Sequence, residues 1–138
     1  MKNSVSLDDL DKKVVDKFKG FIVEAKMTGY DNKINSTLRD SEYQNYLYGI
    51  GRTTPGKIVT NAKGGESYHN YGYAVDITFT TAGKEITNED FDILVVLAQK
   101  YGITWGGMFK SFVDKPHWQV YDKTVYTKIE VVKKKMTS

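Results

Sequence analysis

The chain has 138 residues, which suits a single domain with a hydrophobic core of its own. Forty percent of the residues are hydrophobic and 27% are charged, as in ordinary soluble globular proteins. The absence of cysteine excludes disulfides and thiolate metal sites, so a metal would depend on His, Asp and Glu. The net charge of +3 mildly favours anionic surfaces, but it is too weak to indicate nucleic acid, and no apolar run is long enough to cross a membrane.

The first predicted element is an amphipathic helix near the N-terminus. Ser6 followed by Asp9 resembles a capping box at the start of a helix. Apolar residues then recur at helical spacing up to Gly29, which predicts a helix packed on the core. These residues are Leu7, Leu10, Val14, Phe18, Phe21, Ile22 and Ala25. The opening residues lead directly into charged helical sequence, so we expect no signal peptide.

Residues 32–40 predict a short strand that leads into a second helix, which would end at the Gly49 and Gly51 pair. Arg39 lies at the junction of this strand and helix. The local sequence leaves two roles open for Arg39. It is either an ordinary surface arginine or a fixed fork of donors in a cleft.

A long turn-like loop over residues 52–66 precedes a strand predicted from residue 73 to residue 79. A loop of this length in a compact domain is usually functional or mobile. Side chains alternate along a strand, so Val75 and Ile77 share an apolar face. Asp76 is therefore expected to point the other way, toward a surface that small neighbouring residues keep open.

A helix and two short strands complete the predicted order. A capping signature at Thr87 begins a helix that Gly102 ends. Strands are expected at residues 103–105 and 117–120, the second with His117 on its polar face. We therefore expect an α+β fold with a central antiparallel sheet and flanking helices.

The two histidines of the chain, His69 and His117, each have an aspartate nearby. Asp76 follows His69 by seven residues, and Asp114 precedes His117 by three. Two imidazoles and the Asp76 carboxylate would leave a fourth tetrahedral position open for water, which is typical of catalytic zinc. Spacing alone also allows each histidine to be structural, and it does not separate zinc from cobalt or manganese.

These residues belong to a longer pattern, Ser67-x-His69-x-x-Gly72-x-Ala74-x-Asp76 followed by Asp114-x-x-His117. The pattern resembles the zinc signature of the peptidase M15 family. This family includes D-Ala-D-Ala carboxypeptidases, L-alanyl-D-glutamate endopeptidases, the VanX and VanY enzymes and the catalytic domains of several phage endolysins.

Three further segments extend the resemblance over nearly the whole chain, from residue 7 to residue 121. Arg39-Asp40-x-x-x-Gln44 is similar to the family's upstream segment. Residues 51–65 resemble a loop of Listeria-phage endolysins, and Trp105-Gly106-Gly107 also matches. The resemblance implies a fold like that of hedgehog and the D-Ala-D-Ala peptidases. Residues 1–125 would form the zinc peptidase catalytic domain, and residues 126–138 a basic C-terminal tail or an edge strand.

Position by position, the resemblance implies His69, Asp76 and His117 as ligands of a zinc cofactor. Asp114 would be the catalytic carboxylate, which takes a proton from water and passes it to the leaving amine. Arg39 would be a second catalytic residue, stabilising the oxyanion or holding a substrate carbonyl.

Gln44 and Ser67 are the substrate-binding residues that the resemblance implies. Two other roles stay open for Ser67, as a turn residue or as a hydrogen-bond partner that supports a metal ligand. The sequence departs from the family at Met108, where relatives commonly have Asp, and at Gln119, where many have Glu. We expect activity to survive both departures.

The resemblance implies a zinc-dependent endopeptidase that hydrolyses the L-Ala–D-Glu bond of peptidoglycan stem peptides, as a phage or prophage endolysin. Two alternatives are a D-Ala-D-Ala carboxypeptidase of the same family and a non-catalytic wall-binding or phage structural module. The expected partner is peptidoglycan, with no nucleic acid and no integral membrane segment, and the expected state is a monomer. Without a signal peptide, the protein would stay in the host cytoplasm until its release to the cell wall at lysis.

Overall fold

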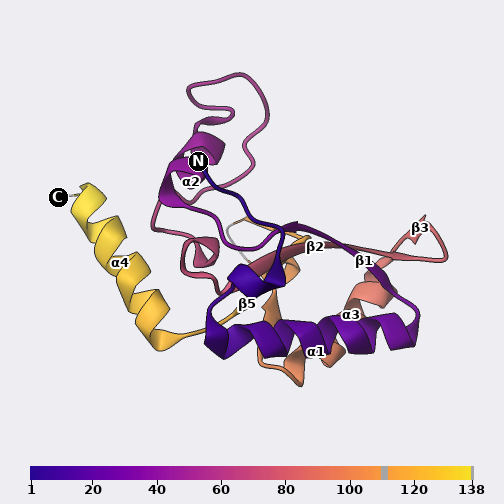
Figure 1. The fold of residues 1–138 in the computed structure, drawn as a ribbon. Coiled ribbons are helices and arrows are strands. Elements are labelled where there is room, and N and C mark those ends of the chain that lie inside the picture. The colour runs from indigo at the N-terminus through magenta and orange to yellow at the C-terminus, as the bar shows by residue number, and fades with distance from the viewer. Residues whose placement is uncertain (110–111, 138) are drawn as a thin grey trace.

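The computed structural model describes residues 1–109 and 112–137 (Figure 1). Within these residues, five strands form one antiparallel sheet in the order β1-β2-β5-β4, with β3 paired to β2. The strands are β1 (Asp31–Ser36), β2 (Ala74–Thr81), β3 (Lys84–Glu85), β4 (Ile103–Trp105) and β5 (His117–Val120).

The described residues form four α-helices, of which α1 and α3 pack against each other and against strands of the sheet (Figure 1). The helices are α1 (Lys12–Thr28), α2 (Ser41–Gly49), α3 (Asn88–Gln99) and α4 (Lys123–Thr137). The short 3-10 turns of the described residues are η1 (Leu7–Asp9), η2 (Tyr68–Tyr71) and η3 (Gly106–Met108). The predicted α+β class is confirmed. Among the described residues, none of the helices is both long and apolar enough to cross a membrane.

The core lies between α1, α3 and the apolar face of the sheet. Phe18 and Phe21 of α1 are completely buried. The Phe21 ring lies 5.7 Å from that of Phe79 on β2 and 5.1 Å from that of Trp118 on β5. Val75 is buried beside them, so the predicted alternation along β2 is confirmed.

The start of α1 differs from the prediction. Ser6 caps only η1, where its side chain accepts a hydrogen bond from the Asp8 backbone N–H. The helix begins after Asp11, whose carboxylate accepts from the Lys13 N–H. By contrast, the predicted capping signature at Thr87 is a true capping box at the start of α3.

The C-terminal segment also differs from the prediction, because residues 123–137 form α4 and no edge strand. Val125 and Ile129 of this helix are buried in the core, and both lie on one side of it. The edge-strand prediction for residues 126–138 is therefore wrong over the described residues, and residue 138 lies outside them. A boundary at residue 125 falls inside α4.

We expect Phe21→Ala to reduce the free energy of unfolding by about 3–5 kcal/mol, because it leaves a cavity between α1, Phe79 and Trp118. Urea unfolding followed by circular dichroism measures the change. Val23→Ala is the control, since Val23 lies on the same helix and is exposed. A loss below about 1 kcal/mol for Phe21→Ala would contradict the described core.

Candidate active site

Strand register brings Asp76 and His117 together. In the β2–β5 pair, Asp76 is the partner of His117, and Val75 is the partner of Trp118. Because side chains alternate across a sheet, the buried Val75 and Trp118 face the core while Asp76 and His117 project from the opposite face. A carboxylate and an imidazole therefore meet on the face that is not covered by α1.

A bulge in β1 adds Ser36 to the same row. The register shifts between Ile34 and Ser36, so that Ser36 is the partner of Asp76 and Asn35 is the extra residue. Ser36 is buried, and its hydroxyl accepts a hydrogen bond from Arg39 Nη2 at 3.1 Å. The bulge thus gives the site a polar partner that regular pairing would displace.

His69 is held by η2, directly before β2. The Ser67 hydroxyl accepts from the His69 N–H, and the Asn70 side chain accepts from the Ser67 N–H, which completes a capping box. Gly72 ends the turn with a φ of +75°, and a Cβ there would lie only 2.8 Å from the backbone N of Asp11. The turn is therefore closely packed, and the His69 side chain is only 2% exposed.

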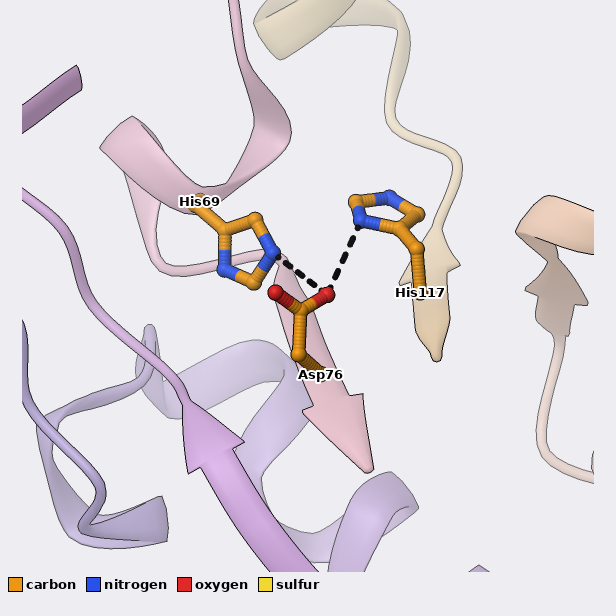
Figure 2. A group of neighbouring side chains, drawn as sticks. All are labelled: His69, Asp76 and His117. Carbon is orange, nitrogen blue, oxygen red and sulfur yellow. Dashed lines mark hydrogen bonds and ion pairs between the residues drawn. The ribbon is translucent and has the colours of Figure 1, made fainter. Parts of the chain in front are cut away.

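Both imidazoles converge on Asp76 (Figure 2). His69 Nε2 lies 3.0 Å from Asp76 Oδ1, and His117 Nδ1 lies 3.4 Å from the same oxygen. One ligand atom from each residue lies within 4.8 Å of the other two. This spacing fits three ligands of a single metal ion.

The outer ring nitrogens show which atoms face the metal position. His69 Nδ1 lies 2.8 Å from the Thr37 carbonyl oxygen, which only accepts, so Nδ1 donates and neutral His69 presents its Nε2 lone pair to the cluster. His117 Nε2 lies 2.7 Å from Gln119 Oε1, which by the same reasoning leaves the Nδ1 lone pair facing inward. Two lone pairs then converge with the Asp76 carboxylate, an arrangement that a cation stabilises.

The electrostatics of the cluster favour an ionised Asp76. Burial alone would raise the pKa of Asp76, but the two adjoining imidazoles outweigh it and hold that pKa well below its ordinary value. Burial lowers the pKa of His69. Burial also disfavours charge on His117, but the hydrogen bond and charge of Asp76 raise the pKa overall. A metal ion and a proton compete for His117 Nδ1, so metal binding would release the proton.

Arg39 adjoins the cluster, with its side chain 10% exposed. Its Nη2 donates to Asp76 Oδ2 at 3.1 Å and to Ser36, and its Nη1 donates to Gln44 Oε1 at 3.0 Å. Asp76 therefore turns one oxygen to the histidines and the other to Arg39. In this geometry Arg39 positions Asp76, and its contact with a substrate oxyanion stays a prediction.

Gln44 is completely buried in α2 and joins Arg39 to the long loop. Its Nε2 donates to the Ala62 carbonyl oxygen at 2.8 Å, while its Oε1 accepts from Arg39. Both functions of the amide are thus used inside the protein. The geometry gives Gln44 a supporting position, which does not favour the direct substrate contact that the sequence suggested.

A cleft of about 500 Å³ opens at the cluster. Ser67 and Asp114 line it together with the three clustered residues. Phe109 and Phe112, which shortly precede Asp114 in the sequence, also line it. Asp114 Oδ2 lies 4.0 Å from His117 Nδ1, and the Asp114 side chain is 35% exposed. Burial raises the pKa of Asp114 above its ordinary value. The structure therefore brings a carboxylate within reach of the metal position and of a molecule in the cleft.

The two departures from the family pattern differ in their surroundings. Met108 is 63% exposed and is not among the residues that line the cleft. Gln119 lines the cleft and contacts the ligand His117 directly. Gln119 therefore orients a ligand, whereas the side chain of Met108 has no such contact among the described residues.

Three contributions to the site were missed from the sequence. The Thr37 carbonyl orients His69, Ser36 supports Arg39, and Lys133 of α4 lines the cleft. A backbone carbonyl leaves no trace in side-chain patterns, and the bulge that places Ser36 has none either. Lys133 follows Ile129 by four residues, but the surrounding lysines obscured that helical spacing.

Comparison with known proteins shows which family the chain resembles. A family model described as D-alanyl-D-alanine carboxypeptidase, in the peptidase M15 family, matches residues 60–120. The Bacillus subtilis (strain 168) peptidoglycan L-alanyl-D-glutamate endopeptidase CwlK is 38% identical, in an alignment that covers 67% of this chain and 62% of CwlK. The chain is therefore similar to the peptidase M15 family. It spans less than two thirds of the length of this M15 relative.

Solved structures show that the M15 fold extends over most of the chain. The L-Ala D-Glu endopeptidase ChiX of Serratia marcescens superposes with a TM-score of 0.61 at 19% identity, covering 87% of this chain and 86% of ChiX. The LD-carboxypeptidase LdcB superposes with a TM-score of 0.63 at 21% identity, covering 96% of this chain and 69% of LdcB. A mutant of the vancomycin-resistance D,D-pentapeptidase VanY, solved in complex with Zn(II), superposes with a TM-score of 0.57 at 18% identity, covering 87% of this chain and 77% of VanY. These likenesses confirm the predicted peptidase fold.

We expect His69→Ala to abolish stoichiometric Zn²⁺ binding, because it removes one of three converging ligands. Calorimetric titration and metal analysis of the dialysed protein measure the change, and circular dichroism checks the fold. Asp114→Asn is the matched control in the same cleft and should bind Zn²⁺ with unchanged stoichiometry. Full zinc occupancy in His69→Ala, or its loss in Asp114→Asn, would contradict the ligand assignment.

Proposed function

We propose that this protein is a zinc-dependent endopeptidase that hydrolyses the L-Ala–D-Glu bond of peptidoglycan stem peptides. The observation that carries the proposal is the cluster of His69, Asp76 and His117 at a cleft that Asp114 also lines. The names of CwlK and ChiX support the choice of bond, since both are L-alanyl-D-glutamate endopeptidases.

The choice of zinc rests on the donor set and on one relative. Two imidazoles and one carboxylate, with no thiolate, match catalytic zinc sites that keep a position open. The VanY structure, which has a similar fold, contains Zn(II). When bound in such a site, zinc lowers the pKa of a water molecule and polarises a carbonyl group.

Asp114 is suited to move the proton. Its carboxylate faces the cleft beside His117 and is partly exposed, so water and the scissile amide can both reach it. Asp114 accepts a proton as the water oxygen bonds to the L-Ala carbonyl carbon. It returns that proton to the D-Glu nitrogen as the C–N bond breaks. The raised pKa of Asp114 suits a group that must both take and release a proton.

Arg39 and Gln119 keep the ligands in place during this reaction. Arg39 holds Asp76 through Oδ2, which leaves Oδ1 directed at the histidines. Gln119 accepts from His117 Nε2 and so keeps Nδ1 turned to the cluster. Partners of this kind fix the orientation and tautomer of metal ligands.

A D-Ala-D-Ala carboxypeptidase is the second candidate, and the description of the matching family model favours it. This activity would remove a terminal D-Ala and would need the site to recognise a free carboxylate. A non-catalytic wall-binding module is disfavoured, because all three ligand positions and Asp114 are present and close together.

We further propose a lytic role, as a phage or prophage endolysin that stays in the host cytoplasm until it is released to the cell wall. The support for this role is the resemblance of residues 51–65 to the loop of Listeria-phage endolysins. A prophage origin of the gene and lysis of host cells on expression with a holin would be the direct tests.

Mass spectrometry of muropeptides digested with the zinc-loaded protein tests the enzymatic proposal. We expect free stem peptides that begin at D-Glu or its amidated form, with at least a hundredfold less product for Asp114→Asn, because general acid–base catalysis contributes about 10²–10⁴-fold. Loss of only a terminal D-Ala would establish the carboxypeptidase instead. Unchanged activity in Asp114→Asn would contradict the role of Asp114.

A further inference from the structure

Helix α4 packs beside the segment that leads from α2 to β2 (Figure 1). Val125 and Ile129 are buried, and a Cβ on Gly65 would lie 3.3 Å from Val132 Cγ2. Lys133 follows Ile129 by four residues and therefore lies over the same side of the helix as the packed residues. This packing places Lys133 on the wall of the cleft, although α4 lies outside the segment that the family model matches.

Among the described residues that line the cleft, two are arginine or lysine and so carry a fixed positive charge, Arg39 and Lys133. The Arg39 guanidinium is nearly buried and already bonded to Asp76, Ser36 and Gln44. The Lys133 side chain is 53% exposed, so its ammonium group can meet a molecule that enters the cleft.

Lys133 also forms an ion pair with Glu130, at 3.7 Å between Nζ and Oε1. Exposed pairs of this spacing on a helix contribute little to stability. Exchanging this exposed pair with Glu130 for a pair with a substrate carboxylate therefore costs little. A compact ammonium on a flexible stem suits such an exchange better than a fixed guanidinium fork.

The two halves of a stem peptide differ in charge around the L-Ala–D-Glu bond. On the acyl side, L-Ala is joined through an amide and carries no carboxylate. On the leaving side, D-Glu carries an α-carboxylate unless it is amidated, and the chain continues to further carboxylates. A cation on one wall of the cleft can therefore tell the two halves apart.

We propose that Lys133 binds a carboxylate on the leaving side of the stem peptide, which rests on the proposed function and makes Lys133 a determinant of substrate direction. The D-Glu half then lies along α4. Stems whose carboxylates are amidated lose this interaction. Lys133 acts in binding and takes no part in the bond-breaking step.

Steady-state kinetics with synthetic stem peptides tests the proposal. For Lys133→Ala we expect a KM about tenfold higher with kcat unchanged, as for loss of one hydrogen bond to a charged group. Lys134→Ala is the matched control, because Lys134 is adjacent but does not line the cleft. Equal KM values for wild type and Lys133→Ala on every peptide would overturn the proposal.

Selective amidation identifies the carboxylate. Two further peptides carry an amide in place of either the D-Glu α-carboxylate or the C-terminal carboxylate. Amidation of the group that Lys133 binds should raise KM in the wild type and should add nothing in Lys133→Ala. If each amide raises KM by the same factor in the wild type and in Lys133→Ala, the proposal that Lys133 binds a carboxylate is overturned.

A binding measurement separates this inference from the proposed function. Calorimetry with the Asp114→Asn protein, with and without Lys133→Ala, reports peptide affinity in the absence of turnover. Lys133-dependent binding without L-Ala–D-Glu cleavage by the wild type would sink the proposed function alone. Cleavage together with binding that does not depend on Lys133 would contradict the present inference alone. If neither cleavage nor Lys133-dependent binding is observed, both proposals are contradicted.

Discussion

The structure depends on the partly buried carboxylate of Asp76. Removing an ionised carboxylate from water is costly unless charged or hydrogen-bonding partners replace the water. Asp76 has such partners on both oxygens, the two imidazoles on Oδ1 and Arg39 on Oδ2. These partners come from η2, β5 and the segment after β1, so the same carboxylate that would bind the metal also holds three separate segments together.

The two faces of strand β2 have different roles, because one packs in the core and the other carries the candidate active site. Val75 and Ile77 are buried under α1, while Asp76 between them faces the cleft. Because the core holds β2 in place, the backbone of Asp76 does not have to move for its carboxylate to reach the histidines. Preorganisation of this kind is what a metal site requires of its supporting elements.

The sequence predicted that His69, Asp76 and His117 lie together, which the structure confirms, but it predicted their surroundings less well. Strand alternation placed Asp76 and His117 on polar strand faces, and the family resemblance grouped them with His69, because both report on side chains at fixed positions. The orientation of Arg39 could not be predicted, since it depends on a bulge that places Ser36 on the site face. Helix α4 was missed because its two buried residues stand among many lysines, so that the segment was predicted as a basic tail or an edge strand.

The most direct test of the central claim is a crystal structure of the zinc-loaded protein with anomalous data at the zinc edge. The account predicts one strong anomalous peak at bonding distance from His69 Nε2, His117 Nδ1 and an oxygen of Asp76, with Arg39 still bonded to that carboxylate. A zinc ion held through the opposite ring nitrogens, or the absence of a peak between these three residues in protein shown to contain zinc, would contradict it.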